Sequence, residues 1–194
     1  MGSQLAVRSG RSSRSVKIVV TGPFGAGKTS LISTISEIDV LSTEKAVTGE
    51  DRARKQSTTV AMDFGRLTID TDLALYLFGT PGQRRFDFMW EILAEGMLGF
   101  VVMVDAEREE ALAEANETLT FFRESANVPY IVAVNKSSAD PQSAVVRARQ
   151  ALHLDDDVRA VACNALDRDS VKEVLVELLY AVLDQIEQPE AAAV

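Results

Sequence analysis

The segment Gly22–Thr29, with the sequence GPFGAGKT, constrains the fold of this chain more than any other feature. It fits the pattern G-x-x-x-x-G-K-[ST], which works only between a β-strand and the N-terminus of a helix. The apolar run Val16–Val20 precedes it, and apolar residues with helical spacing follow from Leu31. We therefore predict a strand, a glycine-rich loop and a helix that ends near Ile38.

This loop is suited to bind a polyphosphate. Its glycines let the backbone curl so that successive N–H groups point inward at phosphate oxygens, and the helix adds the positive end of its dipole. We predict that Lys28 reaches the β- and γ-phosphates and that the Thr29 hydroxyl binds Mg²⁺. The residues of this segment predicted to bind nucleotide are Gly22, Phe24, Gly25, Ala26, Gly27, Lys28, Thr29 and Ser30.

The composition excludes several classes of protein. With 194 residues the chain is most simply one domain, and its net charge of -9 argues against broad binding of nucleic acid. No apolar run approaches the ~18 residues of a membrane span, so we expect no integral membrane segment. One cysteine, Cys163, excludes an internal disulfide framework and suits a cytoplasmic location.

The two ends of the chain differ from the rest. Residues 1–15 are rich in Arg and Ser, contain no acid and show no periodicity, which predicts a disordered tail. The alternative is a weak electrostatic contact with an acidic partner or an anionic lipid. Residues 188–194 are predicted to form a flexible C-terminal tail, which leaves 16–187 as the domain.

Beyond the loop, strand patterns alternate with helix patterns. Strands are predicted at 59–69, 73–78, 98–104, 129–134 and 158–162, and helices at 86–94, 107–125, 141–151 and from 171 to 186. The short turn Asp70–Asp72 makes the first two of these strands an antiparallel hairpin. The chain is therefore predicted to be an α/β protein with a six-stranded, mostly parallel sheet, one antiparallel edge strand and helices on both faces. Residues 39–58 form a long segment without periodicity, which is typical of a functional or disordered loop.

The order of these motifs resembles that of Ras-like small GTPases over residues 16–187. Within that superfamily, Thr58–Gly65 together with Gly79–Gln83 looks like a bacterial branch that holds the small G proteins of actinobacterial conservon operons and, more distantly, the gliding-motility polarity GTPases. The resemblance implies the three-layer sandwich of P-loop NTPases, with GTP or GDP as ligand and Mg²⁺ as cofactor.

The resemblance also implies roles for the two switch segments. Thr59, with Thr58 as the alternative, would bind Mg²⁺ and the γ-phosphate, so that the predicted metal ligands are Thr29 and Thr59. Gly82 would donate its N–H to the γ-phosphate, and Gln83 would orient the attacking water. The predicted catalytic residues are Gln83, Lys28 and Thr59.

The sequence departs from the family at the motif D-x-x-G, because Gly79 stands where the family has aspartate. That aspartate normally holds Mg²⁺ through water. Asp63 and Asp105 are the alternatives for the lost carboxylate, and the sequence favours neither. Phe24 also occupies a slot that is glycine in many relatives, and its bulk is expected to hinder Gln83 and to slow hydrolysis.

Base recognition departs from the family as well. Asn135 and Lys136 follow an apolar strand as in N-K-x-D, but Ser138 occupies the aspartate slot, and Asp140 is the alternative carboxylate. Guanine preference weakens if Asp140 does not reach the base. By resemblance to the S-A-K loop, the remaining base-binding residues are Cys163, Asn164 and Ala165, although a small buried core residue is an equally good interpretation of Cys163.

We therefore predict a GTP-binding molecular switch with slow Mg²⁺-dependent hydrolysis. The alternatives are a non-hydrolysing, nucleotide-dependent interaction module with relaxed selectivity between GTP and ATP, and a P-loop kinase of small substrates. The resemblance implies a Roadblock/LC7-type regulator and a sensor-kinase pathway as partners, with membrane association only through them. Residues 86–90 carry an aromatic cluster that is predicted to be partly core and partly exposed to a partner.

Overall fold

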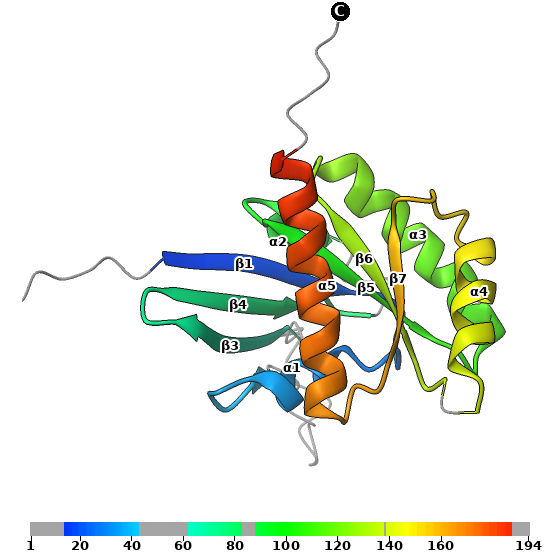
Figure 1. Ribbon diagram of the computed structural model, residues 1–194, viewed down its shortest axis with the longest axis horizontal. Helices are drawn as coiled ribbons and strands as arrows, with labels where there is room; N and C mark the ends of the chain where they lie inside the picture. Colours follow the sequence, from blue (N-terminus) through cyan, green and yellow to red (C-terminus); the bar gives the residue numbers. More distant parts are fainter. Residues whose placement is uncertain (1–13, 43–61, 83–87, 138, 188–194) are drawn as a thin grey trace, which may run out of the picture.

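The computed structural model describes residues 14–42, 62–82, 88–137 and 139–187 (Figure 1). Helices and strands alternate along most of the chain, as the sequence pattern predicts. In chain order the elements are β1 (Arg14–Thr21), α1 (Lys28–Ile35), β2 (Leu41–Ser42), β3 (Asp63–Asp70), β4 (Leu73–Gly79), α2 (Phe88–Ala94), β5 (Gly99–Asp105), α3 (Glu109–Ser125), β6 (Tyr130–Asn135), α4 (Pro141–Ala151), β7 (Arg159–Cys163) and α5 (Arg168–Glu187).

The strands form one sheet in the order β2-β3-β4-β1-β5-β6-β7. All pairs from β4 to β7 are parallel, and β3 is antiparallel to β4, as the predicted hairpin requires. The six predicted strands are confirmed. The described part of the sheet holds a seventh strand, β2, because Leu41 and Ser42 pair antiparallel with Phe64 and Asp63. The antiparallel strand β3 is therefore not at the edge, and two residues are too few to show the periodicity that predicts a strand.

Some predicted boundaries are wrong. The first helix ends at Ile35 rather than near Ile38, because Ser36 is extended and its hydroxyl donates to the carbonyl of Ile38 and accepts from the backbone of Arg66. A serine that bonds to nearby backbone in this way competes with the helix. The strand β1 begins at Arg14, inside the predicted tail. The start of the strand predicted at 59–69 and of the helix predicted at 86–94 lies outside the described residues, as do residues 1–13 and 188–194.

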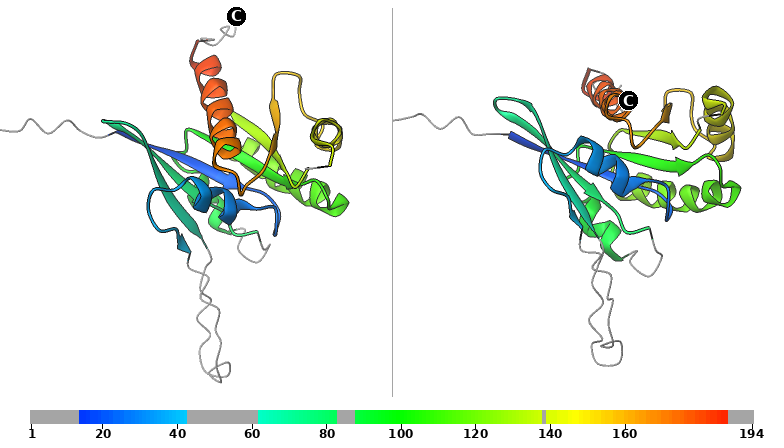
Figure 2. Two further views of the ribbon diagram at one scale, coloured as in Figure 1. Left: turned by 60° about the horizontal axis from the view of Figure 1, so that its bottom comes forward. Right: turned by 90° about the horizontal axis from the view of Figure 1, so that it is seen from below.

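Helices cover both faces of the sheet and produce three layers (Figure 2). On one face, α1 and α5 pack against buried residues such as Ile18, Val101 and Met103. On the other face, α2, α3 and α4 pack against Val19 and Phe100, among others. Alternate residues of the central strands enter opposite layers, since successive side chains of a strand point to opposite faces. The buried stretches of the central strands are consequently almost entirely apolar, which places polar function at the strand ends.

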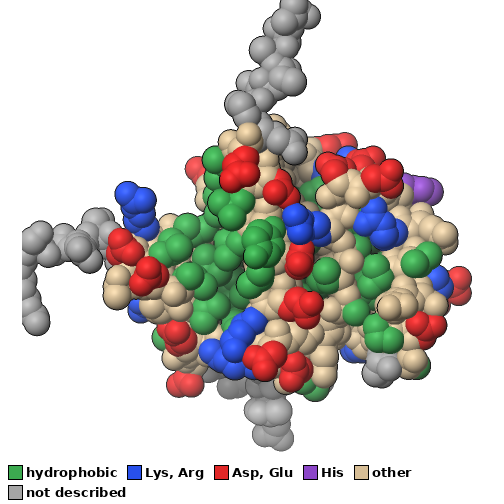
Figure 3. Space-filling view, in the orientation of Figure 1, with side chains coloured by type: hydrophobic (Ala, Val, Ile, Leu, Met, Phe, Trp, Pro, Cys, Tyr) green, Lys and Arg blue, Asp and Glu red, His purple; other side chains and the backbone are tan. Residues whose placement is uncertain are grey.

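One face of the molecule carries a concentration of apolar side chains. Figure 3 shows hydrophobic side chains gathered over α5 and the strands beside it, and α5 exposes Val176, Leu183 and Ile186. Contiguous patches of this kind are more typical of contact surfaces than single exposed apolar residues are. Within the described ranges, no helix combines the length and the apolarity that a membrane span requires.

Candidate nucleotide-binding site

The loop between β1 and α1 has the backbone that the sequence predicts for a phosphate loop. Gly22, Gly25 and Gly27 all have positive φ, at 131°, 81° and 105°. At Gly22 an added Cβ would lie 2.2 Å from the carbonyl oxygen of Met103, so that only glycine fits between the loop and β5. The loop therefore curls where its glycines permit it.

The carbonyl groups of this loop are held by side chains. Lys28 is 7% exposed, and its ammonium donates to the carbonyls of Gly22 at 2.7 Å and Pro23 at 2.8 Å. Arg108 Nη1 donates to the Phe24 carbonyl at 3.1 Å, and Asn135 Nδ2 donates to the Ala26 carbonyl at 2.9 Å. Because the carbonyls are occupied by these donors, the loop can present N–H groups and one buried cation to an anion.

The N-terminus of α1 continues this arrangement. Its first residue is Lys28, and the N-cap position is Gly27, which offers no side-chain cap. The hydrogen bond from Leu31 N to Gly27 O, at 2.9 Å, is the first bond of the helix. The N–H groups of the first turn are thus left for a ligand, together with the positive end of the dipole.

A carboxylate lies beside the threonine of the motif. The Thr29 hydroxyl donates to Asp63 Oδ2 at 2.5 Å, and the Asp63 side chain is almost fully buried. The two residues come from different elements, α1 and β3. Hydroxyl and carboxylate oxygens are the ligands that Mg²⁺ prefers.

The position of Asp63 explains why Gly79 has no side chain. The two residues are register partners in the hairpin. A Cβ on Gly79 would lie 2.9 Å from Ile32 Cδ1 and 3.2 Å from Asp63 Oδ2, so the space is already filled. The other alternative, Asp105, is engaged elsewhere, because it accepts from Lys136 Nζ at 2.6 Å and from the Glu107 backbone at 3.0 Å.

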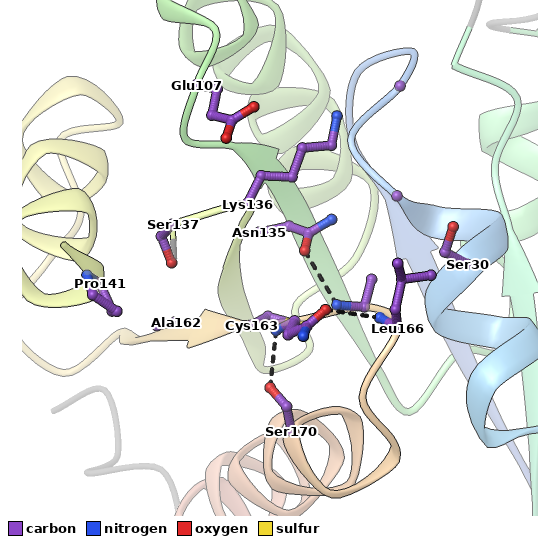
Figure 4. A pocket seen from close by; sticks show the side chains of 14 residues that line it. Ser30, Glu107, Asn135, Lys136, Ser137, Pro141, Ala162, Cys163, Leu166 and Ser170 are labelled. Carbon is purple, nitrogen blue, oxygen red and sulfur yellow. Dashed lines mark hydrogen bonds between the residues drawn. The ribbon is translucent and has the colours of Figure 1, made fainter. Parts of the chain in front are cut away.

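A cavity of about 810 Å³ opens next to the loop (Figure 4). Gly25, Gly27 and Ser30 line it on one side, and the predicted base-binding residues line the other. Those residues are Asn135, Lys136, Cys163, Asn164 and Ala165. The structure thus brings together segments that lie more than a hundred residues apart in sequence, as shown by the bond from Asn135 to Ala26.

Asn135 connects the two sides of the cavity. Its Nδ2 donates to Ala26 O, and its Oδ1 accepts from the Ala165 N–H at 3.1 Å. Lys136 has a positive φ of 58°, and its ammonium donates a hydrogen bond to the Asp105 carboxylate. Cys163 is buried, and desolvation raises the pKa of its thiol from 9.0 to about 11, so this wall is small and uncharged.

Asp140 does not line the cavity. It is the N-cap of α4, where its Oδ1 accepts from the Ser143 N–H at 3.1 Å. Hydrogen bonding to the Ser143 side chain and then to its backbone lowers the pKa of the Asp140 carboxyl group. Ser137 and Pro141 line the cavity near this point, whereas Ser138 lies outside the described residues.

Sequence reasoning missed several residues near the site, among them Glu107, Leu166 and Arg108. Glu107 and Leu166 line the cavity, and Leu166 is 79% exposed. Arg108 contacts the phosphate loop. Leu166 directly follows the predicted base loop, so its position in the sequence could have indicated that it lies near the site. No local pattern marks Glu107 or Arg108.

The segment after β4 lies against the phosphate loop. A Cβ on Gly82 would be 2.7 Å from Phe24 Cα and 2.9 Å from Lys28 Nζ. Phe24 itself is 60% exposed. The predicted residues Gln83, Thr58 and Thr59 lie outside the described residues.

The aromatic cluster after this segment is divided, as predicted. Trp90 is buried and packs edge-on to Phe121 with ring centroids 5.2 Å apart, whereas Phe88 is 60% exposed. The other predicted member, Phe86, lies outside the described residues. One part of the cluster therefore belongs to the core and another part faces solvent.

Comparison with known proteins agrees with a nucleotide site. The chain is 34% identical over 122 residues to the uncharacterized protein MJ1339 of Methanocaldococcus jannaschii, an alignment that covers 63% of this chain and 70% of the relative. A family model described as "Conserved hypothetical ATP binding protein" matches residues 20–188, which include the phosphate loop and the whole cavity. The chain belongs to this nucleotide-binding family.

Proposed function

We propose that the protein is a GTP-binding molecular switch that hydrolyses its nucleotide slowly and with Mg²⁺. The observation that carries the proposal is the phosphate loop, whose carbonyls are held by Lys28, Arg108 and Asn135 and which opens into the same cavity as the base loop. Backbone N–H groups and an ammonium group then face the place where a polyphosphate would lie.

The roles follow from position and, for the switch segments, from the resemblance. Lys28 and the amides of the loop are proposed to position the phosphates. Gly82 lies against the loop, and its N–H is proposed to join them. Gln83 is proposed to orient the attacking water, and Thr59 to bind the γ-phosphate.

The donor set fits Mg²⁺. Thr29 and Asp63 would hold the ion together with Thr59, and the bound ion would supply positive charge to the phosphate oxygens. The Thr29 hydroxyl donates to the buried Asp63 carboxylate, and a cation bound between the two residues would offset the cost of burying that charge.

Hydrolysis is proposed to be slow. Phe24 is 60% exposed and occupies a slot that is glycine in many of the Ras-like GTPases that the chain resembles, and Gly82 already lies against its backbone. Intrinsic rates of such enzymes are about 10⁻⁴ to 10⁻³ s⁻¹, and an arginine supplied by a partner adds roughly 10³- to 10⁵-fold. The resemblance suggests a Roadblock/LC7-type regulator and a sensor-kinase pathway as the source of partners, in the cytoplasm or at the membrane through them.

A second candidate is a non-hydrolysing interaction module with relaxed selectivity between GTP and ATP. Asp140 favours it, because this carboxylate caps α4 instead of lining the cavity. The description of the family as ATP-binding agrees with relaxed selectivity.

Calorimetric titration of nucleotide-free protein with GDP, GTP and ATP, with and without Mg²⁺, tests both candidates. Tight binding that Lys28→Ala abolishes without unfolding the protein is expected, and unchanged affinity in that variant would refute the phosphate site. Single-turnover assays with excess protein then separate the candidates, since the absence of phosphate release with or without partners leaves only the binding role.

A further inference from the structure

We propose that Arg108 is a positioning residue of the phosphate site, which aims the Gly25 N–H at the bound polyphosphate. This inference rests on the proposed function. Arg108 lies in the connection between β5 and α3, and its Nη1 donates to the Phe24 carbonyl at 3.1 Å. No comparison and no sequence motif assigns it a role.

The planar peptide bond between Phe24 and Gly25 links the Arg108 contact to the direction of the Gly25 N–H. A trans peptide is planar, and its C=O and N–H point in opposite directions. Because Arg108 holds the Phe24 carbonyl on one side, the N–H of Gly25 points away from Arg108. Gly25 lines the cavity, and its N–H has no hydrogen-bond partner among the described residues. An unpaired N–H in such a loop is suited to an anion.

Glycine at position 25 makes this orientation possible but does not enforce it. Its φ of 81° lies in a region that glycine occupies freely, so the peptide before it can rotate unless its carbonyl is held. Asn135 holds the peptide after Ala26 in the same manner. The two side chains thus brace the loop on both sides of Gly25.

Hydrogen bonds to Asp105 hold the connection that carries Arg108. Asp105 accepts from the Glu107 N–H at 3.0 Å and, through its carbonyl, from the Arg108 N–H at 3.3 Å, which orders the connection. The other Asp105 oxygen accepts from Lys136 at 2.6 Å. The position of Arg108 is therefore linked to a residue on the base side of the site.

The experiment compares Arg108→Ala, Arg108→Lys and the control Arg147→Ala in the full chain. Arg147 is an exposed arginine on α4 and does not line the cavity. Affinities for GDP and GTP with Mg²⁺ are measured by calorimetry, hydrolysis by single turnover, and the Gly25 amide by NMR before and after addition of GDP.

We expect Arg108→Ala to weaken both nucleotides by roughly ten- to hundredfold, which is the effect of one hydrogen bond to a charged group. The downfield shift of the Gly25 amide proton on GDP binding should shrink with it. Arg108→Lys should recover most of the affinity, because a carbonyl needs only a donor, and Arg147→Ala should match the wild type. Since Arg108 is partly exposed, its loss should leave the fold intact.

Three results would overturn the inference. Unchanged affinity and an unchanged Gly25 shift in Arg108→Ala would show that the loop orients itself. A slower single turnover at normal affinity would mean that Arg108 acts on the transition state. Wild-type protein that binds no nucleotide would overturn the proposed function as well, whereas the first two results leave it standing.

Discussion

Asp63 shows how much one side chain contributes to this site. It lies on β3, opposite Gly79 on β4, and its carboxylate contacts the threonine of the phosphate loop. It therefore occupies the space in which a side chain at position 79 would begin. A carboxylate can reach the same place from either strand of a hairpin.

The substitution Asp63→Asn tests whether this carboxylate helps to bind Mg²⁺. The substitution preserves shape and removes the charge, so we expect the enhancement of nucleotide affinity by Mg²⁺ to fall by about tenfold, as for one charge-assisted contact. Stability should not fall, since a buried charge is replaced by a neutral amide. Asp70→Asn, at the exposed end of the same strand, is the control. Equal Mg²⁺ dependence in both variants would contradict the assignment of Asp63.

Cys163 should be a slow nucleophile. Burial raises its thiol pKa to about 11, and the reactive species is the thiolate. At pH 8 alkylation of the native protein should therefore be roughly a hundredfold slower than that of the unfolded chain. Stability should also decline with increasing pH from 9 towards 11, because the folded state keeps the proton that the unfolded state loses. Mass spectrometry of iodoacetamide-treated protein provides the measurement, and fast native alkylation would be incompatible with the burial of this thiol.

At the scale of a single element, α4 depends on its cap. Asp140 accepts from Ser143 N, with proline at the first helical turn. We expect Asp140→Ala to lower the Tm by roughly 2–4 °C, as the loss of an N-cap does in a protein of this size. The ratio of GTP to ATP affinity should remain unchanged.

The pH dependence has a definite sign. The cap lowers the pKa of Asp140, so its stabilising effect is present at neutral pH and is lost as the pH falls below the ordinary range of a carboxyl group. Thermal melts of wild type and Asp140→Ala should converge at acidic pH. A variant with normal stability and altered base selectivity would instead show that Asp140 reads the base.

At the scale of the whole molecule, α5 covers the hydrophobic core on one face of the sheet. Leu178 is fully buried, and its Cδ1 lies 3.1 Å from the place where a Cβ on Gly99 would be. We expect Leu178→Ala to lower the free energy of unfolding by about 2–5 kcal/mol, through lost burial and a cavity. Leu183→Ala, 49% exposed on the same helix, should change it by no more than ~0.5 kcal/mol. Urea unfolding measures both, and equal effects would contradict the described packing of α5.

The architecture is the part that sequence pattern predicted well. Apolar runs such as Val101–Val104 and the stripe of α5 predicted buried strands and a covering helix, because hydrophobic periodicity depends on neighbours in sequence. Pattern did not predict β2, whose two residues pair only because β3 is alongside.

In the candidate site, too, some features follow from local sequence and others only from the tertiary structure. The glycine spacing of Gly22–Thr29 was sufficient to specify a strand, a curled loop and a helix, since each of these depends on local backbone preference. Packing was needed to bring Asp63 to Thr29 and Arg108 to the Phe24 carbonyl. Those contacts join residues remote in sequence, and their distances follow from strand register and helix placement, which no local pattern encodes.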